Sequence, residues 1–396
     1  MLPKKMLGWG RQRSVIREVF EEGKVMKQKY GVDNVFDFSL GNPSIPSPKS
    51  VNDTLIYLLK EKDNVYLHGY TSGPGDTEVR FTIAEYLNRT YGVNESFERI
   101  YMTCGAAASL AITLHAILSP GDEVILIAPY FAEYTVFVEC AGGIVRVADS
   151  DENAQIDIST LEKAINKKTK AIIINSPNNP SGAVYSEESL IQLSKLLKKK
   201  EQELSSHIYI VSDEPYRELV YDGETVPYIA KYYDNTISCY SFSKALSLPG
   251  ERIGYICVCE KCFGGDNIFA SIQGAGRALG YVCAPSLFQK LIPYVIGQTS
   301  DISLYDENRK LIYEIVKEAG FDAIYPKGAF YLFIKSPFED SKDFCDLAKK
   351  YNILLVRGDG FGKKSYARAS YCVSNEMIKK SRENWMLLGK ECFNGK

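Results

Sequence analysis

Residues 239–254 read Cys-Tyr-Ser-Phe-Ser-Lys-Ala-Leu-Ser-Leu-Pro-Gly-Glu-Arg-Ile-Gly, a stretch that joins one lysine to several anion-binding groups. Ser241 and Ser243 lie three and one residues before Lys244, and Arg252 follows eight residues after it. Hydroxyls and a guanidinium bind phosphate, and a lysine amine can hold an aldehyde as a Schiff base. The set predicts a site for a phosphorylated aldehyde, pyridoxal 5′-phosphate. A strand ending in a polar turn with an exposed lysine is the simpler alternative, but the apolar strand before Lys244 and the Pro-Gly-Glu-Arg-Ile-Gly after it disfavour that interpretation.

Length, composition and charge limit the classes of protein to which the chain can belong. With 396 residues, of which 45% are hydrophobic, it is long enough for two compact domains with large cores. The formal net charge of −2 argues against a nucleic-acid partner, because proteins that bind phosphate backbones usually carry a basic excess. No run of about 20 apolar residues occurs and no apolar segment follows the first lysines, so we expect a soluble, cytoplasmic protein without a membrane segment.

The cysteines suggest neither a disulfide scaffold nor a metal site. Ten cysteines are too few for such a scaffold in a chain of this length, and we expect them to stay reduced. Cys257, Cys259 and Cys262 form a C-x-C-x-x-C pattern, but the first two are two residues apart in a strand-like run and should point to one side as buried hydrophobic residues. Because no second cysteine or histidine cluster completes four ligands, we expect no metal.

Short β-rich runs alternate with helical segments between about Tyr101 and Cys259. This alternation predicts an α/β fold whose mainly parallel sheet is covered by helices. The expected strands are Asp122–Ile127, Ile144–Val147, Ala171–Asn175, Ile208–Ser212, Thr236–Ser241 and Gly254–Cys259. The expected helices are Ala106–Leu118, Thr160–Lys167 and Ser186–Leu204.

The two flanks of this region read as α+β. Ser14–Tyr30 is expected to be a helix with a serine cap, and a long helix is expected near Ser303–Ala319. Ala329–Ile334 alternates like an edge strand, and a terminal helix is expected near Asn375–Gly389.

Polar residues follow three of the expected strands, at the edge where an open α/β sheet binds ligands. They are Asn179, Asp213 with Tyr216, and Lys244. A carboxylate at Asp213 would keep a pyridine nitrogen protonated, so that the ring withdraws electrons when a substrate α-proton leaves. An aspartate that only caps the next turn is the simpler alternative. We expect Tyr216 and Asn179 to hydrogen-bond the phenolic oxygen of the ring.

Gly105, Ala106 and Ala107 open the helix that follows Tyr101–Cys104. Small side chains let backbone N–H groups at a helix N-terminus approach a phosphate dianion closely, so we expect these residues to bind the cofactor. Without Lys244 they would indicate only a well-packed helix start.

The order of these motifs resembles that of the class I/II aminotransferases of pyridoxal-phosphate fold type I, the aspartate-aminotransferase-like proteins. The similarity runs from about Gly41 to about Arg368, and Asn179 lies in an Asn-Pro-Ser-Gly that matches the N-P-x-G of this family. The resemblance implies a large cofactor-binding domain at residues 47–295. It also implies a smaller, discontinuous α+β domain made of residues 1–46 and 296–396.

The resemblance also suggests roles for residues outside the lysine region. Phe131 matches an aromatic residue that stacks on the pyridine ring, although a place in the core is nearly as good an interpretation. Tyr70 matches a tyrosine that reaches the phosphate of the neighbouring subunit, which implies a homodimer with shared active sites. Gly41 resembles a glycine on the substrate-carboxylate side. Arg368 is expected to pair with the substrate α-carboxylate, and Asn179 to contact substrate as well as cofactor; Arg357 is the nearby alternative to Arg368.

The implied activity is transfer of an amino group from an amino acid to a 2-oxo acid by a ping-pong route, with Lys244, Asp213 and Tyr216 as catalytic residues. Glutamate and 2-oxoglutarate are the expected pair, and aspartate, aromatic and neutral amino acids stay open as the other donor. Arg277 lies at roughly the position of an arginine that dicarboxylate-specific members take from the partner subunit, but the surrounding sequence differs. A C–S β-lyase of the cystathionine type, a ring-forming synthase acting on adenosylmethionine, and a non-catalytic pyridoxal-phosphate sensor are the alternatives.

Overall fold

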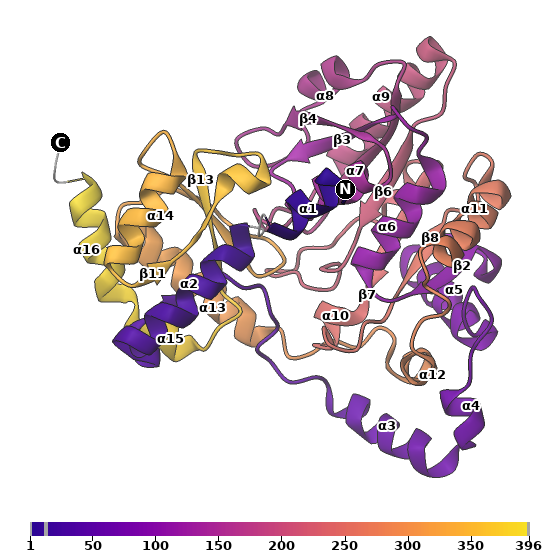
Figure 1. The fold of residues 1–396 in the computed structure, drawn as a ribbon, viewed down its shortest axis with the longest axis horizontal. Coiled ribbons are helices and arrows are strands. Elements are labelled where there is room, and N and C mark those ends of the chain that lie inside the picture. Colours follow the sequence, from indigo (N-terminus) through magenta and orange to yellow (C-terminus); the bar gives the residue numbers. More distant parts are fainter. Residues whose placement is uncertain (1, 12–14, 394–396) are drawn as a thin grey trace.

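The computed structural model describes residues 2–11 and 15–393, and its largest element is a seven-stranded sheet (Figure 1). In spatial order the strands are β2 (Ile100–Thr103), β8 (Gly254–Val258), β7 (Thr236–Ser241), β6 (Tyr209–Asp213), β5 (Thr169–Asn175), β3 (Glu123–Ala128) and β4 (Ile144–Asp149). Strands β7, β6, β5, β3 and β4 pair in parallel, whereas β8 is antiparallel to both of its neighbours. The expected α/β class with a mainly parallel sheet is confirmed.

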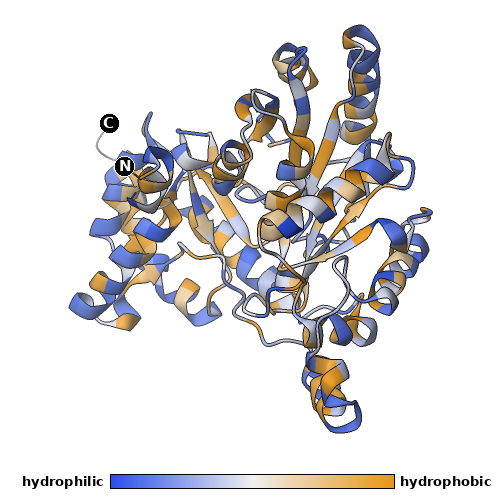
Figure 2. Ribbon diagram, turned by 45° about the vertical axis from the view of Figure 1, so that its right-hand side comes forward, coloured by the Kyte–Doolittle hydropathy of each residue, from blue (hydrophilic) through white to orange (hydrophobic). Residues whose placement is uncertain are grey.

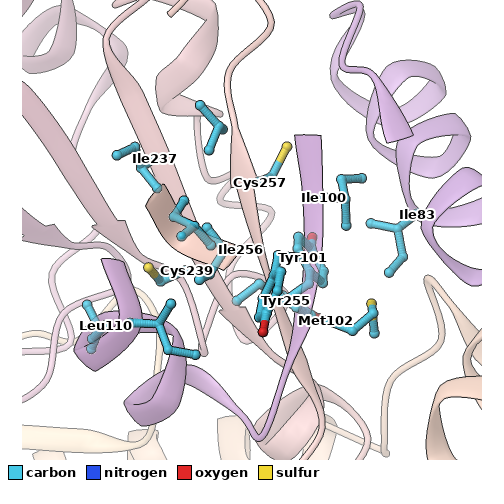
Figure 3. Packing of buried hydrophobic residues seen from close by; sticks show 14 of the residues in the cluster. Ile83, Ile100, Tyr101, Met102, Leu110, Ile237, Cys239, Tyr255, Ile256 and Cys257 are labelled. Carbon is cyan, nitrogen blue, oxygen red and sulfur yellow. The ribbon is translucent and has the colours of Figure 1, made fainter. Parts of the chain in front are cut away.

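Helices cover both faces of this sheet, which is why β3 and β7 are buried at every position. The helices of this part of the chain are α3 (Lys49–Glu61), α4 (Asn64–His68), α5 (Thr77–Tyr91), α6 (Ala106–Ile117), α7 (Glu133–Cys140), α8 (Ile158–Ala164), α9 (Glu187–Leu204), α10 (Phe242–Ala245), α11 (Gly265–Ala278) and α12 (Ser286–Val295). Alternate residues of β3 face opposite sides, so Val124 and Leu126 belong to one buried cluster and Ile125 and Ile127 to another. Figure 3 shows part of the first cluster, in which β2, β7, β8 and α6 pack together.

A smaller unit lies beside the large sheet and takes its residues from both ends of the chain (Figure 1). It contains a four-stranded sheet in the order β12 (Val356–Arg357), β13 (Tyr366–Ser370), β10 (Tyr331–Lys335) and β9 (Ala323–Ile324), and a parallel pair of β1 (Phe36–Asp37) with β11 (Ile353–Leu354). The helices of this unit are α2 (Val15–Tyr30), α13 (Ser303–Glu318), α14 (Ser341–Lys350), α15 (Asn375–Lys380) and α16 (Arg382–Phe393), whereas α1 (Lys4–Arg11) lies near α7, where Lys5 pairs with Glu139 at 3.1 Å. Phe36 and Phe38 share one buried cluster with Trp385, so the two ends of the chain build a common core.

Two elements of this smaller unit differ from expectation. The edge strand expected at Ala329–Ile334 is an interior strand, because β10 pairs with both β13 and β9 and four of its five residues are buried. The single helix expected at Asn375–Gly389 is broken at Ser381, whose hydroxyl donates to the carbonyl of Ile378 at 2.7 Å. Such local competition for a backbone carbonyl interrupts helices.

Two expected helix starts have different outcomes. The helix expected at Thr160–Lys167 begins earlier, as α8, because the carboxylate of Asp157 accepts from the backbone N–H groups of Ser159 and Thr160 and so caps it. The helix expected at Ser14–Tyr30 is present as α2, but the proposed cap Ser14 lies outside the described residues.

Hydropathy follows the layers of the fold. Figure 2 shows apolar residues along the strands and polar residues on the outer helix faces. No helix in the described part of the chain has both the length and the apolar character needed to cross a membrane. Cys257, Cys259 and Cys262 are buried in one apolar cluster, and within residues 2–11 and 15–393 no three His, Cys, Asp or Glu side chains gather as a metal site.

Candidate active site

A cavity of about 710 Å³ lies where the carboxyl ends of β5, β6 and β7 meet the smaller unit. It brings together most of the residues that the sequence predicts for the site. Those lining it are Gly41, Ala106, Ala107, Phe131, Asn179, Asp213, Tyr216, Ser241, Ser243, Lys244, Arg252 and Arg368. These residues come from both ends of the chain and from its central region, and the fold brings them together around one cavity.

Lys244 lies on α10, directly after β7, and its amine faces this cavity. Nζ donates to the carbonyl oxygen of Gly41 at 2.8 Å. Burial lowers the pKa of Lys244 to about 8, and the positive charges of Arg252 and Arg368 act in the same direction. This shift favours the neutral amine, the form that acts as a nucleophile or general base.

Asp213, the last residue of β6, is a buried carboxylate with one unused oxygen. The hydroxyl of Tyr134 donates to Oδ2 at 2.5 Å, whereas Oδ1 has no hydrogen-bond partner among the described residues. Burial raises the pKa of Asp213 to about 7, because the charged form has lost its hydration. An orphaned carboxylate oxygen on a cavity wall suits a cationic N–H donor, such as a protonated pyridine nitrogen.

An anion-binding corner is formed by the start of α6 and the segment around Lys244. Gly105 precedes α6 with φ +87°, and no side chain caps that helix start, so its backbone N–H groups stay available. The hydroxyls of Ser241 and Ser243 lie 2.7 Å apart, and Nη1 of Arg252 donates to Ser243 Oγ at 3.4 Å. A Cβ on Gly105 would lie 2.6 Å from Nη2 of Arg252, so only glycine lets the arginine approach the helix start this closely. These donors suit a phosphate dianion.

Arg368, on β13, is a buried guanidinium without a carboxylate partner in the described part of the chain. Nη1 donates to Asn179 Oδ1 at 3.0 Å and Nη2 to the carbonyl of Ser39 at 2.6 Å, while Nε has no partner within residues 2–11 and 15–393. The guanidinium also lies over the ring of Tyr331, 4.5 Å from its centroid. Arg357, the alternative, instead forms an ion pair with Asp359 at 3.1 Å. The geometry therefore favours Arg368 as the carboxylate-binding arginine.

Tyr216 and Gly41 meet at Tyr331, which the sequence alone does not single out. The hydroxyls of Tyr216 and Tyr331 are 2.9 Å apart, and burial raises the pKa of Tyr216 well above its usual value. A side chain on Gly41 would overlap the hydroxyl of Tyr331, so glycine is needed there for packing as well as for any contact with substrate.

Two residues from the sequence analysis lie away from the cavity in the single chain. Tyr70 is 89% exposed and is not among the lining residues, so its role at a neighbouring subunit stays a prediction. Arg277 is exposed near the end of α11 and does not line the cavity either.

Three functional residues are missed by the sequence analysis. Tyr134 holds Asp213, and Tyr331 holds Tyr216 and stacks on Arg368. Asn175 donates from Nδ2 to the backbone carbonyl of Asp213 at 2.8 Å and accepts from the N–H of Asn179, also at 2.8 Å. The position of Asn175 at the end of an expected strand is the one feature of the sequence that could have indicated its role. No feature of the sequence indicates the roles of the two tyrosines.

Comparisons with known proteins agree with this geometry. The family described as "Aminotransferase class I and II" matches residues 33–383. An aspartate aminotransferase of Thermotoga maritima is 31% identical over 351 residues, covering 87% of this chain and 89% of that protein. An aromatic-amino-acid aminotransferase of Thermococcus litoralis is 28% identical over 96% of both chains.

Solved structures show the same relationship. A crystal structure of an amino transferase from Eubacterium rectale has a TM-score of 0.97 at 52% identity and covers 99% of both chains. Aspartate aminotransferase from Thermus thermophilus with maleate has a TM-score of 0.86 at 26% identity, covering 98% of this chain and 99% of that one. This chain therefore belongs to the class I and II aminotransferases, enzymes that use pyridoxal 5′-phosphate to move an amino group between amino acids and 2-oxo acids.

Proposed function

We propose that the enzyme exchanges amino groups between glutamate and 2-oxoglutarate as one pair and aspartate and its 2-oxo acid as the other. The observation that carries this proposal is the cavity shared by a lysine of lowered pKa, an aspartate and a buried arginine; among the described residues, Oδ1 of the aspartate has no hydrogen-bond partner and the arginine has no carboxylate partner. The name of the relative from Thermotoga maritima supports aspartate as a substrate.

Substrate binding is assigned to Arg368 and Asn179. A guanidinium presents parallel N–H donors that match a carboxylate, and such charge-assisted bonds are about twice as strong as neutral ones. The side-chain oxygen of Asn179 holds the guanidinium plane from one side, and Tyr331 supports it from below. The α-carboxylate of an amino acid would thus be oriented before any bond changes.

When bound, pyridoxal 5′-phosphate supplies an electron-withdrawing ring that stabilises negative charge on the substrate carbon next to the amino group. Oδ1 of Asp213, which has no partner among the described residues, would accept from a protonated ring nitrogen, and that positive charge would favour the ionised carboxylate despite its burial. Tyr134 and Asn175 fix the position of Asp213. Ser241, Ser243, Arg252 and the start of α6 would hold the phosphate, Tyr216 and Asn179 the phenolic oxygen, and Phe131 the ring face.

Lys244 is assigned the proton transfers. With the cofactor bound, its amine would stand beside Cα of the substrate and would take the proton from that atom and return it in the reverse direction. A pKa of about 8 suits both directions, because the amine must accept and release a proton in each half-reaction. Gly41 offers a carbonyl that can hold the amine in place, since the two are 2.8 Å apart.

The proposal includes two domains, a large one of residues 47–295 and a small one of residues 1–46 and 296–396. Cytoplasmic localisation stays a prediction.

The proposal also includes a homodimer with shared active sites. Helices α3 and α4 project from the body of the molecule (Figure 1) and expose apolar side chains. These are Ile56, Tyr57, Leu59, Val65 and Tyr66, and the 89% exposed Tyr70 follows them. Burial of such a patch against a second copy would remove it from water and bring Tyr70 to a neighbouring phosphate corner.

The proposal is tested by a half-reaction screen. The loaded enzyme is mixed with one amino acid at a time without an acceptor, and pyridoxamine phosphate and 2-oxo acid are quantified by chromatography. Stoichiometric 2-oxo acid with glutamate and aspartate supports the proposal. Repeated release of pyruvate and ammonia without an acceptor would instead identify a lyase. For the dimer, Tyr70→Ala and Lys244→Ala subunits are mixed, and recovery of activity shows that sites are shared.

A further inference from the structure

The active-site cavity contains one cationic side chain for which the proposed mechanism has no role. Among its described lining residues the cations are Arg17, Lys244, Arg252 and Arg368. Lys244 is committed to the aldehyde, Arg252 to the phosphate and Arg368 to the α-carboxylate. Arg17, on α2, is left over.

Packing fixes the face of α2 that is turned to the cavity. Val19 is buried against Val35 and Leu354, which ties the helix to the smaller unit. Ile16 and Phe20, one helical turn apart, line the same cavity as Arg17. Arg17 is thus held at the cavity wall by a helix whose position is set by its neighbours.

The charged groups that follow Arg17 on α2 have partners, whereas Arg17 has none among the residues that the structure describes. Glu18 pairs with Arg357 at 3.7 Å, Glu22 with Lys349 at 2.8 Å and Lys24 with Glu21 at 3.0 Å. Arg17 forms no ion pair with any of the described residues, including Asp213 and Glu133, the carboxylates that line the cavity. An uncommitted guanidinium beside the substrate space is therefore available to an anion.

An amino acid with a carboxylate in its side chain brings two anions into the cavity. Arg368 can pair with only one of them, and Arg17, whose side chain is exposed at the cavity wall, can offer the second a charge-assisted pair. Ile16 and Phe20 offer apolar contact for the methylene groups between the two carboxylates.

We infer that Arg17 binds the side-chain carboxylate of the substrate and so selects dicarboxylic amino acids. The inference rests on the proposed function, because it assumes that Arg368 takes the α-carboxylate. It assigns to the chain's own N-terminal helix a role for which Arg277 of a partner subunit was the candidate from sequence.

The test compares two unreactive ligands of equal carbon number, succinate and butyrate, in binding to the loaded enzyme by calorimetry. Arg17→Met keeps the length of the side chain and removes its charge. It is expected to weaken succinate binding by about 10- to 100-fold, the usual effect of losing a charge-assisted contact, and to leave butyrate binding unchanged. Arg17→Lys should fall in between.

Lys24→Met is the matched control, because it removes one positive charge from the same helix outside the cavity. It should leave both affinities at wild-type values. An Arg17→Met enzyme that bound succinate like wild type, or that lost succinate and butyrate equally, would refute the inference. A wild-type enzyme that converted no amino acid at all would instead refute the proposed function, so the two failures are distinguishable.

Discussion

Replacing Asp213 by asparagine should stabilise the cofactor-free protein in a pH-dependent way while abolishing catalysis. The carboxylate is buried, and its pKa is raised from the usual 3.8 to about 7. Below pH 3.8 the carboxyl group is protonated in both the folded and the unfolded state, so it does not change the free energy of unfolding. The cost appears as the pH rises between these values and is fully present above about pH 7.

The size of the effect follows from this difference in pKa. Each tenfold change in proton affinity is worth about 1.4 kcal/mol, so full ionisation of Asp213 costs about 4 kcal/mol, of which about 2.5 kcal/mol develops between pH 5 and pH 8. Asparagine carries no such cost. For a chain of 396 residues this corresponds to about 3 °C in melting temperature.

Thermal unfolding of cofactor-free wild type and Asp213→Asn at pH 5 and pH 8 checks the reasoning. The melting temperature of the variant relative to wild type should rise by about 3 °C between the two pH values. In the cofactor-loaded form the substitution should be harmful, and the half-reaction rates of the variant should fall by orders of magnitude relative to wild type. A difference in melting temperature that did not depend on pH, or that fell with pH, would show that Asp213 is not a buried, strained carboxylate.

Three other variants and one control variant probe the remaining parts of the site. Lys244→Ala should bind the cofactor without a covalent link, so borohydride reduction should not attach the cofactor to the protein. Turnover should be nearly lost, and turnover at the wild-type rate would remove Lys244 from the mechanism. Arg368→Lys should lower kcat/KM by about 10- to 100-fold, mainly through KM, because the fork is lost. Arg357 pairs with Asp359 outside the cavity, so Arg357→Lys should change kcat/KM little. Equal losses of kcat/KM in the two variants would contradict the assignment of Arg368 to the α-carboxylate. Tyr331→Phe leaves the buried hydroxyl of Tyr216 without its 2.9 Å partner and should cost about 1–3 kcal/mol in urea unfolding; an unchanged midpoint would mean that Tyr216 finds another partner.

The sheet could be read from the sequence because its signals are local. The strand expected at Thr236–Ser241 has those bounds in the structure, and the helix expected from Ser186 starts at Glu187 with Ser186 as its cap. Each rests on apolar runs and capping residues a few positions apart. The interior position of β10 was not readable, because it depends on which strands pair with it across the smaller unit.

The same distinction applies to the site. Lys244 is predictable from the serines and the arginine near it in the sequence, and Asp213 from its place at the end of an expected strand, where an open α/β sheet binds ligands. Tyr134, Tyr331 and Arg17 belong to elements whose neighbours are set only by tertiary packing, and an isolated tyrosine or arginine in a sequence carries no such information. The partner of a buried group is a property of the fold rather than of its local sequence.

The pairing of β1 with β11 has a consequence for synthesis on the ribosome. Phe36 aligns with Ile353, so β1 cannot pair with β11 until nearly the whole chain has emerged from the ribosome. At translation rates of about 5–20 residues per second, this delay is on the order of 15–60 s. The large sheet is complete once β8 has left the exit tunnel, and its phosphate- and aldehyde-binding residues can assemble in the meantime. A nascent chain thus acquires the half of the catalytic centre that carries Lys244 well before the half that carries Arg368.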